Sequence, residues 1–206
     1  MSCITIRRIA RLATAIFSLT VALCLVTPCH AQNLQQIDKN GITIVDSSPS
    51  YPSGGDWGVQ NVLDLTAPSS YPFPTVAANQ YVTDYASAGA GTNTFIIFDL
   101  GTQYTLSAIL FTDRTTSGAG NGAFVGGISD FCTSYMFTFS NDVTFATDVG
   151  TLVVNVSPPS RPTSLESFQT LSIITGIPPV EYVKWQVLAN NGSNNNGAAD
   201  FAFFGM

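Results

Sequence analysis

The sequence is poor in the residues that catalytic and redox sites most often use. It has one histidine and four cysteines among 206 residues. His30 and three of the cysteines lie within the first 31 residues, so Cys132 is alone in the rest of the chain. The region after residue 31 therefore has no histidine for a catalytic triad or for a general base near neutral pH. It also has no second cysteine with which Cys132 could form an internal disulfide.

The first 31 residues have the pattern of a secretory signal peptide. Three arginines between positions 7 and 11 precede an apolar run over residues 12–26, and the segment ends in small residues at Ala31. A membrane anchor is the alternative, but the run is short for a span of about 20 residues. We expect cleavage between Ala31 and Gln32, then a polar lead-in over 32–41 and one domain over 42–206. The expected location is extracellular, or periplasmic in a Gram-negative source, with no transmembrane segment after signal removal.

The chain that follows the signal peptide is acidic. Three of the seven basic residues lie in residues 1–31 and all thirteen acids follow them, so four bases face thirteen acids and the formal net charge is −9. Nucleic acids bind basic surfaces, so this charge excludes a nucleic-acid-binding protein. A chain of about 175 residues buries roughly 70% of its unfolded surface and needs no disulfide. We therefore expect Cys132 to be a small buried residue.

From residue 42 onward, short β-rich runs alternate with turn-rich stretches. In one run the aromatic residues Tyr135, Phe137 and Phe139 occupy every second position and so share one face, as in a half-buried strand. Two runs, 94–100 and 105–111, are apolar on both faces, as are strands that are covered on both sides. Eight runs are expected to be strands: Ile42–Asp46, Thr94–Leu100, Thr105–Asp113, Thr133–Ser140, Thr151–Val156, Phe168–Ile174, Glu181–Ala189 and Ala199–Gly205. With only one short helical turn, at Val59–Leu63, the pattern predicts an all-β jelly-roll β-sandwich of about eight antiparallel strands.

The motifs do not indicate an enzyme. The acidic residues show no spacing that singles out a catalytic carboxylate pair. The glycine-rich run Gly118–Gly122 has no lysine and opens no helix, so it does not meet the requirements of a phosphate-binding loop. Long connections at Tyr51–Ala78, Thr115–Ser129 and Asn190–Ala198 are then the expected ligand surface, because loops on a rigid sandwich commonly carry function.

Seven short phrases occur in a fixed order along the chain: Ile44–Ser48, Trp57–Asp64, Phe95–Gly101, Leu106–Phe111, Tyr135–Asp142, Glu181–Val187 and Asp200–Gly205. In order and spacing they resemble the discoidin, or coagulation-factor type C, domains of the galactose-binding-like superfamily. The resemblance covers about residues 42–205. It implies a secreted, non-catalytic module that binds carbohydrate, on a cell surface or in the environment, through loops at one end of the sandwich. The alternative is a module of the same fold that mediates protein adhesion or matrix interaction.

The resemblance also implies a set of ligand-binding residues. Carbohydrate-binding relatives stack a loop aromatic on the sugar ring, and here Tyr71 or Phe73 would supply it. Arg114 and Asn121 would bind the hydroxyl groups, since the planar fork of an arginine makes bidentate hydrogen bonds. The alternative for Arg114 is a structural ion pair with a neighbouring aspartate, Asp113 or Asp130.

The two tryptophans are expected to be structural. Trp57 lies in a Trp-Gly phrase that packs against the sandwich in the resembled family. Trp185 lies on the apolar face of its strand. We predict that both belong to the core and do not bind a ligand.

A structural Ca²⁺ is the cofactor that the resemblance implies. In related modules such an ion ties the loop after the first strand to the final strand, and calcium takes six to eight oxygen ligands. The matching positions would supply carboxylate, carbonyl and hydroxyl oxygens: Asn61, Asp64, Thr66, Ser69, Ala199 and Asp200. From the residues alone, Asp64 fits a turn cap equally well, and Asp200 fits a solvated carboxylate.

Overall fold

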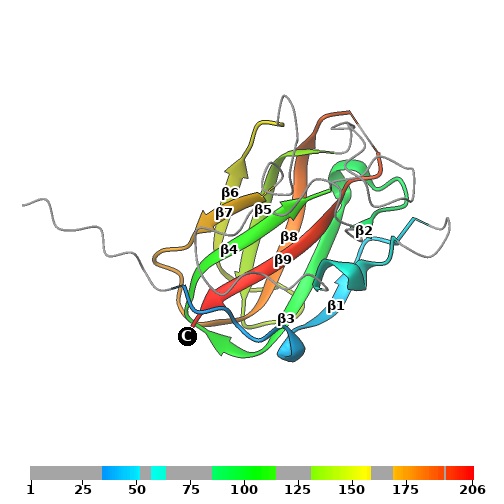
Figure 1. Ribbon diagram of the computed structural model, residues 1–206. Helices are drawn as coiled ribbons and strands as arrows, with labels where there is room; N and C mark the ends of the chain where they lie inside the picture. The colour runs from blue at the N-terminus through cyan, green and yellow to red at the C-terminus, as the bar shows by residue number, and fades with distance from the viewer. Residues whose placement is uncertain (1–33, 52–56, 64–84, 115–130, 159–168, 193) are drawn as a thin grey trace, which may run out of the picture. The chain divides into compact units, whose positions relative to one another are not determined.

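Two antiparallel sheets make up most of the structure (Figure 1). The computed structural model describes residues 34–51, 57–63, 85–114, 131–158, 169–192 and 194–206. These residues contain three short 3₁₀ helices and no α-helix: η1 (Lys39–Gly41), η2 (Val59–Leu63) and η3 (Gly91–Asn93). Within these ranges, no helix has the length and apolar character needed to cross a membrane.

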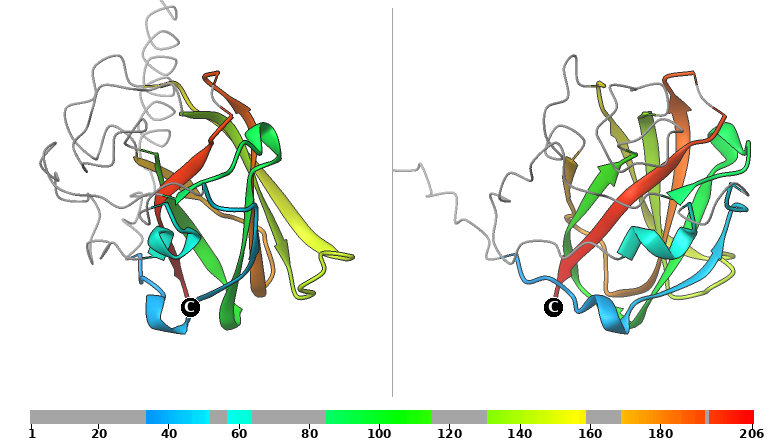
Figure 2. Two further views of the ribbon diagram at one scale, coloured as in Figure 1. Left: turned by 90° about the vertical axis from the view of Figure 1, so that its right-hand side faces the viewer. Right: turned by 45° about the vertical axis from the view of Figure 1, so that its right-hand side comes forward.

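The nine strands of the described residues divide into sheets of five and four strands, which Figure 2 shows as two layers. The five-stranded sheet has the order β1 (Thr43–Ser47), β3 (Phe95–Tyr104), β8 (Val180–Asn190), β5 (Cys132–Ser140), β6 (Asp148–Asn155). The four-stranded sheet has the order β2 (Tyr85–Ala86), β9 (Gly197–Gly205), β4 (Leu106–Asp113), β7 (Gln169–Ile173). The predicted all-β sandwich is confirmed, with one strand more than the eight expected.

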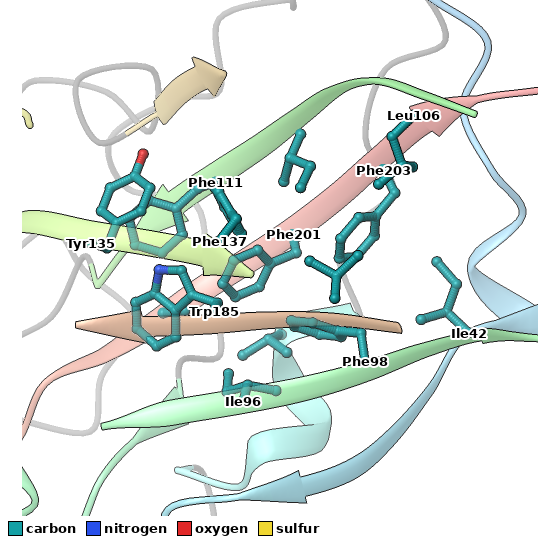
Figure 3. Packing of buried hydrophobic residues seen from close by; sticks show 14 of the residues in the cluster. Ile42, Ile96, Phe98, Leu106, Phe111, Tyr135, Phe137, Trp185, Phe201 and Phe203 are labelled. Atoms are coloured by element: carbon teal, nitrogen blue, oxygen red, sulfur yellow. The ribbon is translucent and has the colours of Figure 1, made fainter. Parts of the chain in front are cut away.

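The main core lies between the sheets and is rich in aromatic rings (Figure 3). Tyr135, Phe137 and Phe139 of β5 point inward and are fully buried, as their alternation predicted. The ring centroid of Phe111, from β4 in the other sheet, lies 4.6 Å from that of Tyr135 and 5.3 Å from that of Trp185. Such rings bury large apolar areas and so account for much of the core's stabilisation. The prediction that Trp185 belongs to the core is confirmed.

The outer face of β4 is buried as well. Leu110 lies with Ala202 and Phe204 of β9 in a second apolar cluster, separate from the main core. The prediction of two apolar faces is therefore confirmed for β4. For β3 it was wrong, because the outward side chains of Phe95 and Ile97 are only half-buried.

Part of the expected polar lead-in is integrated into the sandwich. The backbone nitrogen of Ile37 donates to the carbonyl of Phe203 at 2.9 Å, and that of Gly205 donates to the carbonyl of Gln35 at 2.9 Å. The side chain of Ile37 joins the main core. Residues 35–37 thus run along β9, although their polar composition gave no sign of it.

The strand that was not predicted, β2, has two residues. It pairs with Gly197 and Ala198 of β9. A side chain at Gly197 would overlap the carbonyl of Tyr85, so a glycine at this position permits the close approach of the two backbones. A two-residue strand has no alternation for a sequence pattern to reveal. The other eight strands overlap the predicted ranges, and η2 spans the predicted helical turn.

Candidate functional site

Four strands end or begin together at one end of the sandwich, from which the predicted ligand loops depart. β4 ends at Asp113 and β5 begins at Cys132, so the connection between them opens here. Asp113 pairs with Ala198 near the start of β9, and Cys132 pairs with Asn190 at the end of β8. We refer to this region, formed by residues 113–114, 131–132, 190–192 and 194–198, as the loop end.

Among the described residues, Trp57 and Asn195 hold Arg114 at the loop end. Its guanidinium carbon lies 4.7 Å from the ring centroid of Trp57, the distance of a cation–π contact. Its Nη1 donates to the carbonyl oxygen of Asn195 at 2.6 Å. Arg114 is 4% exposed and Trp57 is 9% exposed, and a desolvated cation–π contact is stronger than an exposed one. Trp57 is therefore buried as predicted, and its face packs against the one arginine in the described residues.

Asp113 ties together the two ends of the connection that follows Arg114. Its carboxylate accepts a hydrogen bond from the backbone nitrogen of Arg114 at 2.7 Å and another from that of Cys132 at 2.8 Å. Asp113 is buried, and hydrogen bonds to a charged acceptor are stronger than neutral ones. From the sequence, this aspartate was expected only as an ion-pair partner for Arg114. A single carboxylate that clamps both ends of a loop could not be inferred before the register of β4 and β5 was known.

Cys132 is fully buried beside this carboxylate, as predicted. Its Sγ lies 3.8 Å from the carbonyl oxygen of Gly197, to which it donates. Burial, and after it the neighbouring charge of Asp113, raises the pKa of the Cys132 thiol well above its usual value. The thiol therefore stays protonated at neutral pH and does not supply a nucleophile or a metal ligand.

An asparagine-rich turn joins β8 to β9 at the loop end. Three hydrogen bonds hold it against residues 87–91: Ser87 N to Asn196 O at 2.9 Å, Gly89 N to Asn195 Oδ1 at 3.1 Å, and Gly91 N to Asn194 O at 2.9 Å. The residue Asn194 is exposed. An amide side chain has both donors and acceptors, so a turn held in this way suits a ligand that carries several hydroxyl groups.

Of the four predicted ligand residues, the structure describes one. Arg114 lies at the loop end, where the resemblance placed it. Tyr71, Phe73 and Asn121 lie outside the described residues. The stacking of Trp57 on Arg114 was not predicted, because the two residues are 57 positions apart and no local pattern joins them.

The predicted calcium ligands are only partly described. Asn61 lies in η2, and Ala199 and Asp200 lie in β9. Ala199 falls at a register shift, where Thr112 and Asp113 of β4 pair with Asp200 and Ala198. Asp64, Thr66 and Ser69 lie outside the described residues. Among the described residues, no three side chains of His, Cys, Asp or Glu lie close enough together to hold a metal ion.

The carboxylate of Asp200 is already engaged by a cation. Lys39 Nζ lies 2.8 Å from its Oδ1 and 3.0 Å from its Oδ2. Asp200 is buried, so the alternative of a solvated carboxylate was wrong. The candidate ligands that the structure describes can therefore hold a calcium ion only in two ways. Either the ion shares the Asp200 carboxylate with the Lys39 ammonium, or the ion displaces the ammonium.

Comparison with known proteins identifies the fold. No model of a known protein family matches the sequence, and no curated protein matches it. Solved structures do match. A family 32 carbohydrate-binding module (CBM32-3) of a family 31 glycoside hydrolase from Clostridium perfringens is 18% identical, with a TM-score of 0.56 over 83% of this chain and 95% of that one.

Two further structures extend the match. A second family 32 module from Clostridium perfringens, solved with GalNAc-β-1,3-galactose, is 15% identical, with a TM-score of 0.57 over 82% of this chain and 99% of that one. An F5/8 type C domain from Bacteroides fragilis is 11% identical, with a TM-score of 0.58 over 85% of this chain and 98% of that one. The chain therefore has the galactose-binding-like fold of these modules, as the order of its phrases predicted.

Proposed function

We propose that this protein is a non-catalytic module that binds carbohydrate at the loop end of its sandwich. The observation that carries the proposal is the placement of Arg114, which Trp57 and the Asn195 carbonyl hold at that end. Two modules with this fold were solved in complex with galactose and with GalNAc-β-1,3-galactose. Their ligands suggest galactose or N-acetylgalactosamine as the sugars to test first.

Two features of the loop end suit a sugar ligand. Exposed amide groups, such as that of Asn194, can exchange hydrogen bonds with hydroxyl groups. The guanidinium of Arg114 has five donors in a planar fork. Since this side chain is buried, its role would be to hold Trp57 and the Asn-rich turn in place. We expect weak affinity for a single site, because shallow loops bury little area.

The experiment is a glycan-array screen of the purified protein, followed by titration calorimetry with the sugars that bind. Asn194→Ala should weaken binding at least several-fold without lowering the melting temperature. Gln103→Ala is a matched control, because it removes an exposed amide from β3 at the opposite end of the sandwich. If the wild type and both variants bind the sugar with equal affinity, the sugar does not bind at the Asn-rich turn.

A blank array with a folded protein would contradict the carbohydrate proposal. It would favour the alternative, a module for protein adhesion or matrix interaction, and a pull-down with extracellular proteins would then follow. Either function requires export, which we propose on the signal-peptide pattern of residues 1–31. Mass spectrometry of the exported protein should give an N-terminus at Gln32.

A further inference from the structure

Strand β6 is the outermost strand of the five-stranded sheet, and no other strand of the described residues pairs with it on its far side. It pairs with β5 over Asp148–Asn155, and Figure 1 shows it at the margin of its sheet. It is one residue shorter than β5 and three residues longer than β1, the strand at the other edge. A long edge strand presents a row of backbone donors and acceptors to any strand that can pair with it.

The direction of these backbone groups follows from the pairing with β5. The nitrogen of Val156 donates to the carbonyl of Thr133 at 3.0 Å. Residues of an antiparallel strand point their N–H and C=O groups alternately toward and away from the neighbouring strand. Residues 154, 152 and 150 therefore face β5, whereas Asn155, Val153 and Thr151 direct their backbone groups outward.

The three residues that direct their backbone groups away from β5 also have exposed side chains, as does Val149 at the register shift. Val149 is 39% exposed and Val153 is 51% exposed, and Thr151 and Asn155 are also exposed. No residue from 149 to 155 is charged. The open edge is thus an uncharged run of residues with high β-propensity, in a protein whose net charge is strongly negative.

The other sheet edges carry devices that discourage pairing, and β6 carries only one, a register shift near its first residue, where Val149 is inserted between the pairs Gly150–Phe139 and Asp148–Ser140. β1 has five residues, a register shift between Ile44 and Asp46, and an aspartate within the strand. β2 has only two residues and β7 has five. Short length, bulges and charges are the usual protections of an edge strand. β6 has eight residues, with neither a proline nor a lysine and with its only charge at Asp148, the first residue.

We propose that β6 is a homodimer interface, in which it pairs antiparallel with β6 of a second copy about a two-fold axis through Leu152. In this register Thr151 lies opposite Val153 of the second copy, and Val153 lies opposite Thr151. Both residues direct their backbone groups outward, so the exposed N–H and C=O groups of Thr151 and Val153 gain partners in both copies. An uncharged edge is also the place where two copies of an acidic chain can meet with least repulsion. The two five-stranded sheets become one sheet of ten strands, an isologous interface.

Sedimentation and light scattering of the purified protein across a concentration series test the proposal. We expect a mass of two chains at high concentration. The variant Thr151→Lys/Val153→Lys places lysine opposite lysine at two pairs and should be monomeric, because like charges directly opposite each other destabilise a sheet. Gln186→Lys/Leu188→Lys adds the same charge at the same spacing on the interior strand β8 and should remain a dimer. Circular dichroism verifies that both variants are folded.

A charge swap tests the register. The variant Thr151→Glu/Val153→Glu should be monomeric alone and should form a heterodimer when mixed with the Thr151→Lys/Val153→Lys variant. Hydrogen exchange should also slow with protein concentration at the amides of Thr151 and Val153. A monomeric wild-type protein at high concentration would overturn the proposal, as would a dimer that keeps its mass in the double-lysine variant.

Discussion

Lys39 and Asp200 form an ion pair between η1, the first described 3₁₀ helix, and β9, the last strand. The ammonium nitrogen lies 2.8 and 3.0 Å from the two carboxylate oxygens, and the side chains are 14% and 4% exposed. Lys39 belongs to η1 near the start of the described residues, and Asp200 belongs to β9, the last strand. A pair with so little exposure differs from a surface salt bridge, because removal of one partner leaves a charge in a site of low dielectric constant.

The first prediction is that either single substitution in this pair destabilises the fold strongly. Lys39→Met leaves the carboxylate without its ammonium partner, and Asp200→Leu leaves the ammonium in a buried site. Each should lower the free energy of unfolding by about 3 kcal/mol, measured by urea denaturation. The double variant should recover much of this loss, because it leaves no uncompensated charge. Additive losses in the double variant would show that the two side chains do not interact.

The second prediction concerns calcium, which we propose on the sequence resemblance to bind near Asp64 and Asp200. Asp64→Ala should lower the melting temperature in calcium and leave it unchanged in EDTA, since a ligand stabilises only the state that binds it. Lys39→Met should respond more strongly to calcium than the wild type, because the ammonium and Ca²⁺ compete for one carboxylate. The same loss for Asp64→Ala in EDTA and in calcium would contradict the metal site.

Several parts of the fold could be predicted because they repeat locally. Tyr135, Phe137 and Phe139 place three aromatic rings on one face, opposite Met136 and Thr138, so their strand and its buried face were predictable from five consecutive positions. Lys39 and Asp200 are 161 residues apart, and only the course of the chain along β9 brings them together. Short-range patterns contain no information about such a pair. For the same reason they did not predict the contact between Arg114 and Trp57.

The third prediction is a loss of stability at alkaline pH that depends on buried tyrosines. Burial raises the pKa of Tyr85 and of Tyr135 above the ordinary value of 10.0, so the folded state favours the neutral phenols. Their contribution to stability is complete below the unfolded pKa of about 10 and decreases as the pH rises above it. Each tyrosine should lower the unfolding free energy by about 1.4 kcal/mol per pH unit in that range.

Tyr85→Phe separates this effect from general alkaline denaturation. The variant should lose about 1 kcal/mol at neutral pH, because the phenol donates to the carbonyl of Ser48 at 2.7 Å. Above pH 10 its unfolding free energy should decrease less steeply than that of the wild type. Identical slopes in urea denaturation series at pH 9 to 11 would show that Tyr85 does not titrate on unfolding.

The fourth prediction uses Cys132 to report on the clamp at the loop end. The thiol is buried and its pKa is raised, so a thiol-specific reagent such as Ellman's reagent should label it only as fast as the protein opens. Asp113→Asn keeps the shape of the clamp but removes the charge that binds the backbone nitrogens of Arg114 and Cys132. This variant should label faster, because weaker hydrogen bonds make local opening at the start of β5 less costly.

Ser140→Ala is the control for a local effect, since Ser140 lies in the same strand at the end far from Cys132 and donates to the carbonyl of Thr147 at 2.7 Å. If Asp113 acts as a local clamp, the Asp113→Asn variant should label faster than a Ser140→Ala variant of matched global stability. Equal labelling rates at equal stability would mean that Cys132 is exposed only by global unfolding. The two ends of the loop would then be held by the sheets themselves and not by the Asp113 carboxylate.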